Sequence, residues 1–101
     1  MITIDKTQHG KKIVTQKGEV LHVQLAENPT TGYQWYINSL DDNHLEYTEK
    51  DYEMSGEAIG AGGTKTFYFE VIKAGISELH ISLGKPWENE PVDTFSVTIE
   101  S

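Results

Sequence analysis

Thr66-Phe67-Tyr68-Phe69-Glu70-Val71 decides the fold class, because larger apolar side chains occupy every second position along it. Successive side chains of a β-strand point to opposite faces, so this pattern predicts a strand with one buried face. The same alternation predicts strands at residues 19–25, 33–38, 76–83 and 93–100, with less regular ones at 2–15 and 45–53. No segment shows a helical repeat of apolar residues, and the sequence therefore predicts an all-β protein.

The strand pattern favours an immunoglobulin-like β-sandwich of about seven or eight antiparallel strands. The length predicts a single domain over residues 1–101. Trp35 is expected in the core, covered by the row that contains Phe67 and Phe69. An up-and-down β-barrel is the alternative architecture.

Composition excludes several classes of function. The chain has no cysteine, which rules out disulfides, thiolate metal ligands and a cysteine nucleophile. Sixteen acidic residues against eight basic ones give a net charge of −8, so no nucleic-acid or membrane partner is expected. The N-terminus lacks the features of a signal peptide, which predicts a cytoplasmic protein. A processed chain would instead be lumenal or secreted.

Three motifs rich in glycine, proline and tryptophan separate the predicted strands, at Asn28–Tyr33, Ile59–Gly63 and Gly84–Trp87. Because successive antiparallel strands reverse direction, alternate connections emerge at the same end of a sandwich. All three motifs are therefore expected at one pole, which we interpret as the working surface.

The first motif is expected to be stiff. Pro29 fixes its own backbone torsion and restricts Asn28, Thr30 and Thr31 are β-branched, and Gly32 permits a sharp reversal. A stiff loop loses little conformational entropy on binding, which favours a wedge-like contact with a partner. A well-formed hairpin loop without a partner is the alternative.

The other two motifs offer different contacts. Gly60, Gly62 and Gly63 leave an extended backbone open to pairing with a partner, and Ile59 is a candidate apolar anchor. Trp87 on a polar loop is of the residue type most enriched at binding hot spots. The alternatives are a mobile solvent loop and a tryptophan that packs down onto the end of the sandwich.

No residue pattern indicates catalysis. The four histidines lie on different segments without metal-ligand spacing, and no carboxylate pair or nucleophile motif is recognisable. The segment Asp41–His44 is better explained as a turn with Asx hydrogen bonding than as a calcium loop. We therefore expect no catalytic residue, no metal and no cofactor.

The motifs Asn28–Tyr33, Gly60–Gly63 and Lys85-Pro86-Trp87 together resemble the chagasin family, proteinaceous inhibitors of papain-like cysteine peptidases. They occur in the family's order and spacing, and the similarity extends over nearly the whole chain. The resemblance implies an immunoglobulin-like fold and reversible, tight, non-covalent inhibition of papain and cathepsin-type peptidases. The inhibitor would act as a monomer and remain uncleaved.

The resemblance also implies where each motif would lie in a peptidase cleft. The first would be central, with Thr30 nearest the catalytic cysteine and histidine. The second would run along the non-primed side, with Ile59 approaching the apolar S2 pocket. Trp87, oriented by Pro86, would stack on aromatic residues of the primed side. The implied peptidase-binding residues are Asn28, Pro29, Thr30, Thr31, Gly32, Ala58, Ile59, Gly60, Lys85, Pro86 and Trp87.

One residue departs from the family pattern. The third motif commonly begins with arginine, whereas this chain has Lys85. Lysine is a point charge and would weaken any bidentate or stacked contact, so reduced affinity for some targets is expected.

Two other functions compete with inhibition. An immunoglobulin-like adhesion or carbohydrate-binding module would use Trp87 and tyrosines at the same pole as a sugar platform. A small hydrolase would need a nucleophile–base pair, which the sequence does not show.

Overall fold

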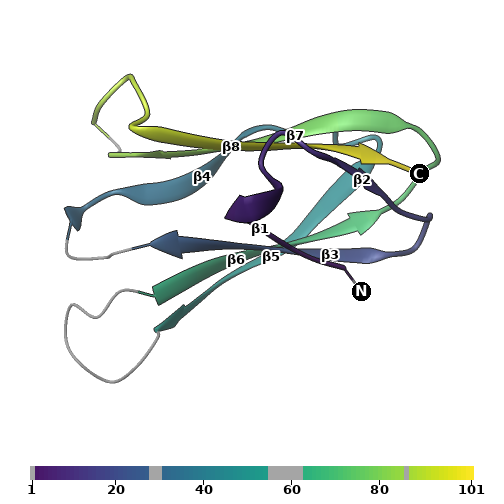
Figure 1. Ribbon diagram of the computed structural model, residues 1–101, viewed down its shortest axis with the longest axis horizontal. Helices are drawn as coiled ribbons and strands as arrows, with labels where there is room; N and C mark the ends of the chain where they lie inside the picture. Colours follow the sequence, from purple (N-terminus) through teal and green to yellow (C-terminus); the bar gives the residue numbers. More distant parts are fainter. Residues whose placement is uncertain (1, 28–30, 55–62, 86) are drawn as a thin grey trace.

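The computed structural model describes residues 2–27, 31–54, 63–85 and 87–101, with only the backbone for 49–54. These residues form two four-stranded sheets that face each other, in the orders β1-β3-β6-β5 and β2-β8-β7-β4 (Figure 1). This arrangement confirms the predicted β-sandwich and is incompatible with a closed barrel. The strands are β1 (Ile2–Asp5), β2 (Lys12–Val14), β3 (Val20–Glu27), β4 (Gln34–Ser39), β5 (Leu45–Met54), β6 (Gly63–Val71), β7 (Ile76–Gly84) and β8 (Asp93–Glu100).

The N-terminal segment contributes one strand to each sheet. β1 pairs in parallel with β3 and β2 pairs in parallel with β8, so these two pairings depart from the expected antiparallel pattern. The 3-10 turn η1 (Lys6–Gln8) carries the chain from one sheet to the other (Figure 1). Asp5 begins this turn by accepting a hydrogen bond from the backbone N–H of Thr7. Nothing in the described residues forms a helix able to cross a membrane.

The core lies between the sheets and consists of the inward-facing rows of the predicted alternation. Trp35 is 3% exposed, which confirms its predicted place in the core. Burying a side chain such as Phe67 or Phe69 contributes about 1.5–3 kcal/mol. The buried apolar residues are Ile4, Leu21, Val23, Leu25, Trp35, Leu45, Phe67, Phe69, Val71, Leu79, Ile81, Phe95, Val97 and Ile99.

The strand register brings three connections to one pole, at the left of Figure 1. In the first sheet Gly63 pairs with both Glu27 and Met54, so β3 and β5 end where β6 begins. In the second sheet Gln34 pairs with Gly84, so β4 begins where β7 ends, and β8 begins beside them. We call these the first (β3–β4), second (β5–β6) and third (β7–β8) connections and their common end the loop pole. The register agrees with the predicted clustering of the three motifs.

Several strand boundaries at the loop pole differ from the sequence prediction by one or two residues. Gly63, expected in a loop, is the buried first residue of β6, and it lies between β3 and β5 with both as neighbours. β3 continues two residues beyond Leu25 to Glu27. The side chain of Glu27 lies on the inner face, where it accepts a hydrogen bond from the N–H of Trp35 and forms an ion pair with Lys65.

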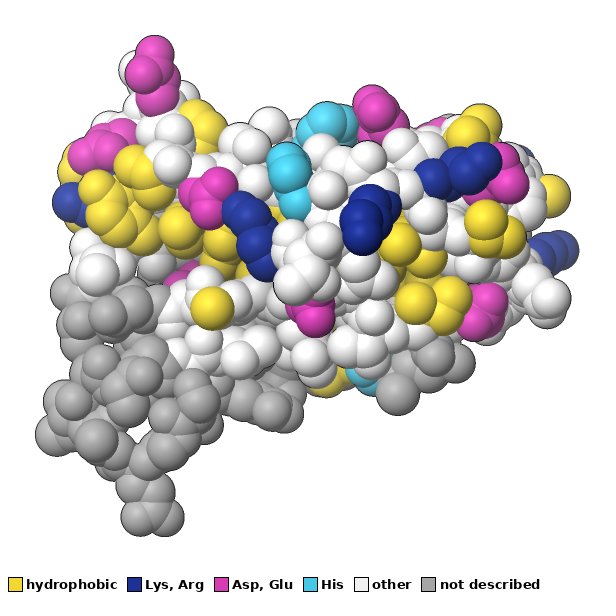
Figure 2. All heavy atoms as spheres, in the orientation of Figure 1, with side chains coloured by type: hydrophobic (Ala, Val, Ile, Leu, Met, Phe, Trp, Pro, Cys, Tyr) yellow, Lys and Arg dark blue, Asp and Glu magenta, His cyan; other side chains and the backbone are white. Residues whose placement is uncertain are grey.

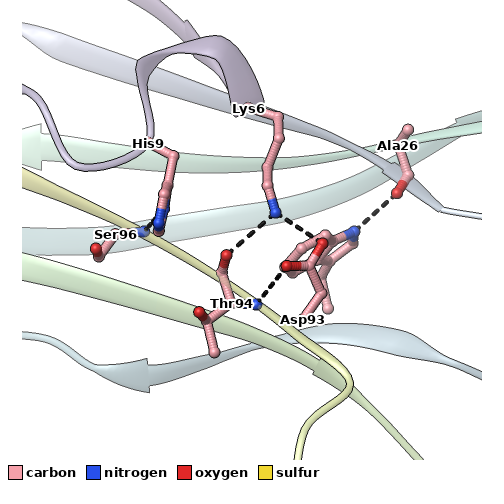
Figure 3. A network of polar contacts seen from close by, with 7 residues as sticks. Lys6, His9, Ala26, Asp93, Thr94 and Ser96 are labelled. Carbon is pink, nitrogen blue, oxygen red and sulfur yellow. Dashed lines mark hydrogen bonds and ion pairs between the residues drawn. The ribbon is translucent and has the colours of Figure 1, made fainter.

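Lys6 of the turn η1 lies next to Asp93 and Thr94 at the start of β8 (Figure 3). Nζ of Lys6 lies 2.7 Å from Oδ2 of Asp93 and donates to the carbonyl of Thr94 at 3.1 Å. The same ammonium group lies 5.3 Å from the ring centroid of Trp35. Lys6 therefore ties the crossing segment to the start of β8.

This contact predicts a pH-dependent contribution to stability. The hydrogen bond from Lys6 holds the pKa of Asp93 below its usual value. Such a carboxyl group stabilises the fold above its unfolded pKa of about 4, and the contribution is lost as pH falls through the folded value. Both side chains are more than two-fifths exposed, so we expect at most about 1 kcal/mol. Thermal unfolding of wild type and Asp93→Asn should differ near neutral pH and coincide at about pH 2. An equal difference at both pH values would contradict this linkage.

The opposite pole is held by a buried histidine. Nδ1 of His44 lies 2.6 Å from the hydroxyl of Ser77, and its Nε2 lies 2.8 Å from that of Ser101. The N–H of Asn43 donates to the Asp41 carboxylate at 3.1 Å, which confirms the predicted Asx turn. This end is therefore closed by hydrogen bonds between its own elements.

Candidate functional site

Four of the predicted peptidase-binding residues lie in the described part of the chain. These are Thr31, Gly32, Lys85 and Trp87, which belong to the first and third connections. The other predicted residues, Asn28, Pro29, Thr30, Ala58, Ile59, Gly60 and Pro86, lie outside the described residues.

The first connection has a left-handed backbone conformation at Gly32. The φ angle of Gly32 is +80°, in the left-handed region that glycine adopts without a steric penalty. Beside it, the hydroxyl of Thr31 accepts a hydrogen bond from the N–H of Tyr33 at 3.4 Å. This φ angle agrees with the conformational freedom expected of Gly32, which lies two residues before the start of β4.

Lys85 bridges the first and third connections. Its Nζ lies 4.8 Å from the ring centroid of Tyr33 and 5.7 Å from that of Trp87. Its Cε would lie 4.0 Å from a Cβ built on Gly32, so the lysine stem passes next to this glycine. Each cation–π contact of this kind contributes about 0.5–1 kcal/mol at an exposed site. Lysine at this position therefore links two aromatic rings even without the planar group of arginine.

Trp87 is 73% exposed, so the alternative in which it packs down onto the sandwich is wrong. The N–H of Glu88 donates to the carbonyl of Lys85 at 3.1 Å, which closes a turn around the tryptophan. Val92, on the same connection, is also exposed. Figure 2 shows apolar side chains gathered with acidic ones at this end of the molecule. The third connection thus offers a large aromatic side chain to a partner.

The surface beside the third connection is hollowed. The hollow has a volume of about 350 Å³ and is lined by Gln34, Tyr36, Gly84, Lys85 and Glu88. Its lining combines an aromatic ring, an amide and both signs of charge. Because Lys85 belongs to the hollow and also contacts the ring of Trp87, a partner that covers the tryptophan would meet this hollow as well.

Trp35 is hydrogen-bonded at the base of the first connection. Its indole N–H donates to the carbonyl of Ala26 at 2.8 Å (Figure 3). Its backbone N–H donates to the carboxylate of Glu27 at 2.8 Å, and its carbonyl accepts from Nζ of Lys65 at 3.1 Å. Glu27 and Lys65 also form an ion pair at 3.4 Å, with side chains 6% and 7% exposed. The two ends of the connection are therefore tied together below the surface.

Glu27 and Lys65 were not predicted as site residues, although their positions in the sequence carried a signal. Glu27 continues the inward-facing row that includes Leu25, and Lys65 precedes Phe67 in another inward-facing row. Charged residues are almost never fully buried unless they are paired. Opposite charges at inward positions of two strands thus indicate a buried ion pair once the strands are known to be neighbours.

The loop pole has the composition of a binding surface. Within the described ranges, no three His, Cys, Asp or Glu side chains are close enough together to hold a metal ion. The described features are instead an exposed tryptophan, a lysine between two rings and a glycine with a positive φ angle. These features define a β-sandwich that presents loops from one end to a macromolecular partner.

Comparison with known proteins identifies the family. Residues 14–99 match the family described as chagasin family peptidase inhibitor I42, and the chain belongs to this family. It is 28% identical to chagasin of Trypanosoma cruzi over 101 residues, which cover 95% of this chain and 92% of that protein. The family match confirms the resemblance seen in the three motifs and the expectation of an inhibitor rather than an enzyme.

Solved structures show the same fold. The cysteine protease inhibitor EhICP2 from Entamoeba histolytica has a TM-score of 0.89 at 16% identity, over 98% of this chain and 93% of that one. PbICP-C, solved in complex with falcipain-2, has a TM-score of 0.69 at 15% identity, over 99% of this chain and 97% of that one. These similarities confirm the immunoglobulin-like sandwich, whereas the contacts assigned to individual residues stay predictions.

Proposed function

We propose that this protein inhibits papain-like cysteine peptidases by occluding the active-site cleft with its three connections. The observation that carries the proposal is their convergence at one pole, where Trp87 is exposed and linked to Tyr33 through Lys85. PbICP-C, which has a similar fold, was solved in complex with falcipain-2, and this supports a peptidase as the partner.

The sheet topology supports a central position for the first connection. This connection passes from the first sheet to the second, whereas the second connection joins two strands of the first sheet and the third joins two strands of the second sheet. In the proposed complex the first connection therefore meets the catalytic centre, with Thr30 nearest to it. Ala58, Ile59 and Gly60 contact the non-primed side, and Trp87 contacts the primed side.

The proposed inhibition is reversible and non-covalent. The chain has no cysteine with which to form a disulfide to the peptidase thiol. Affinity would instead come from the area covered and from the low conformational entropy lost by a loop that is already held in place. The contacts of Lys85 with the rings of Tyr33 and Trp87 hold the described parts of the pole together.

The pole is less suited to the alternative role in carbohydrate binding. A sugar platform needs aromatic faces that are free to stack on the ligand. The ammonium group of Lys85 lies over the rings of both Tyr33 and Trp87, so one face of each ring already has a cationic neighbour.

The test is a titration of papain and a cathepsin with the purified protein, following residual activity and the integrity of the inhibitor over hours. We expect stoichiometric inhibition, recovery of activity on dilution and an intact chain at the end. Rapid cleavage would show that the loops act as a substrate. No inhibition at micromolar concentration would contradict the proposal, and glycan binding would then support the carbohydrate-binding alternative.

A further inference from the structure

We propose that Glu27, Trp35 and Lys65 form a buried brace that positions the first and second connections for binding. This inference rests on the proposed inhibitory function and assigns a positioning role to residues away from the loop motifs. None of the three is expected to contact the peptidase, since each is less than a tenth exposed.

The brace joins the residues that flank two connections. Glu27 is the last residue of β3, directly before the first connection, and Trp35 is the second residue of β4, directly after it. Lys65 is the third residue of β6, so it closely follows the second connection. The hydrogen bonds and ion pair among these residues therefore fix the spacing of three strand ends that the loops extend from.

The two charged side chains take the place of a neighbouring strand for Trp35. β4 is the outermost strand of its sheet, and the backbone N–H and carbonyl of Trp35 are bonded by Glu27 and Lys65 of the other sheet. An exposed strand edge leaves such groups open to other partners, and inward-pointing charges are one way to cover it. The brace thus links the two sheets at the point where the chain crosses between them.

A contribution to stability does not by itself explain why this ion pair is present. Removing two charges from water costs free energy that their attraction offsets only in part, and a well-packed apolar pair is often as stable. Charged hydrogen bonds do, however, require a defined geometry from both partners. A pair that contributes little net stability but fixes three strand ends would lower the ordering cost when the loops bind.

The test compares two double variants by inhibition constant and thermal unfolding. Glu27→Gln/Lys65→Met removes the brace charges while keeping side chains of similar length. Lys12→Met/Glu100→Gln is the matched control, because it removes the same charges from an exposed pair on β2 and β8. We expect the brace variant to stay folded with an inhibition constant about tenfold higher, and the control to inhibit like wild type.

A spectroscopic measurement separates positioning from general loss of structure. In the brace variant the backbone N–H and indole N–H resonances of Trp35 should shift, while those of core residues such as Phe95 stay in place. In wild type the backbone N–H of Trp35 should exchange with solvent as slowly as core amides. Rapid exchange there would overturn the inference even if the double variant failed to fold.

The outcomes distinguish this inference from the proposed function. Failure of the wild-type protein to inhibit any papain-like peptidase would contradict the proposed function itself. Inhibition by wild type that is matched by the folded brace variant would leave the proposed function in place and overturn the positioning role.

Discussion

Replacing Lys65 by methionine alone is expected to lower the free energy of unfolding by about 3–5 kcal/mol. Methionine preserves most of the volume of the lysine stem but removes the ammonium group. Glu27, with 8% of its surface exposed, then remains in the interior without its cationic partner, and the carbonyl of Trp35 loses a donor. The large expected effect comes from a buried carboxylate that has lost its lysine, not from the lost attraction alone.

Urea denaturation followed by tryptophan fluorescence measures this effect. Lys12→Met is the control, since Lys12 pairs with Glu100 at the surface, where an ion pair contributes only about 0–1 kcal/mol. The Glu27→Gln/Lys65→Met variant should be clearly more stable than Lys65→Met, because it buries no carboxylate that has lost its lysine. A single variant as stable as wild type would show that Glu27 reaches water and that the pair is not buried in solution.

Replacing Trp87 by alanine is expected to raise the inhibition constant roughly 10- to 100-fold, a loss of about 1–3 kcal/mol in binding. The side chain is 73% exposed in the free protein, so its removal should leave the unfolding temperature nearly unchanged. Most of its contact area would be lost only from the complex. The expected signature is thus weaker inhibition by an equally stable protein.

Inhibition and thermal unfolding of the same preparations test this prediction against Ile76→Ala. Ile76 is a second exposed apolar residue, 61% exposed, but it lies at the start of β7, away from the loop pole. The control should inhibit like wild type. If Trp87→Ala inhibits as well as wild type, the tryptophan has no role as an anchor, and the third connection contributes through other residues.

Much of the fold could be predicted because strand periodicity is a local property. The rows in β6 and β7 follow directly from the alternation of apolar residues, and Trp35 was correctly placed in the core. The common pole followed from the reversal of successive strands. The parallel pairings of β1 with β3 and of β2 with β8 could not be predicted in this way. Strands of three or four residues carry little pattern, and they pair with whichever sheet edges remain free.

The local features of the candidate site could be predicted from the sequence, but the contacts between its connections could not. The positive φ angle of Gly32 and the exposure of Trp87 follow from residue type and local context, and the structure agrees with both expectations. The position of Lys85 over Tyr33 and Trp87 depends on how the first and third connections approach each other. A sequence pattern does not specify how far apart two connections lie, so this contact could be found only from the tertiary structure.

The sequence by itself therefore determined the strands, their inward faces, the family and the loop pole, because each depends on residue type, spacing or chain reversal. Only the tertiary structure decided that Glu27 and Lys65 meet at Trp35. They lie 38 positions apart on strands of one sheet, and they bond the backbone of a strand in the other. A buried charge is stabilised by whichever groups the packed sheets place within hydrogen-bonding distance, and that choice is made only when the two sheets come together.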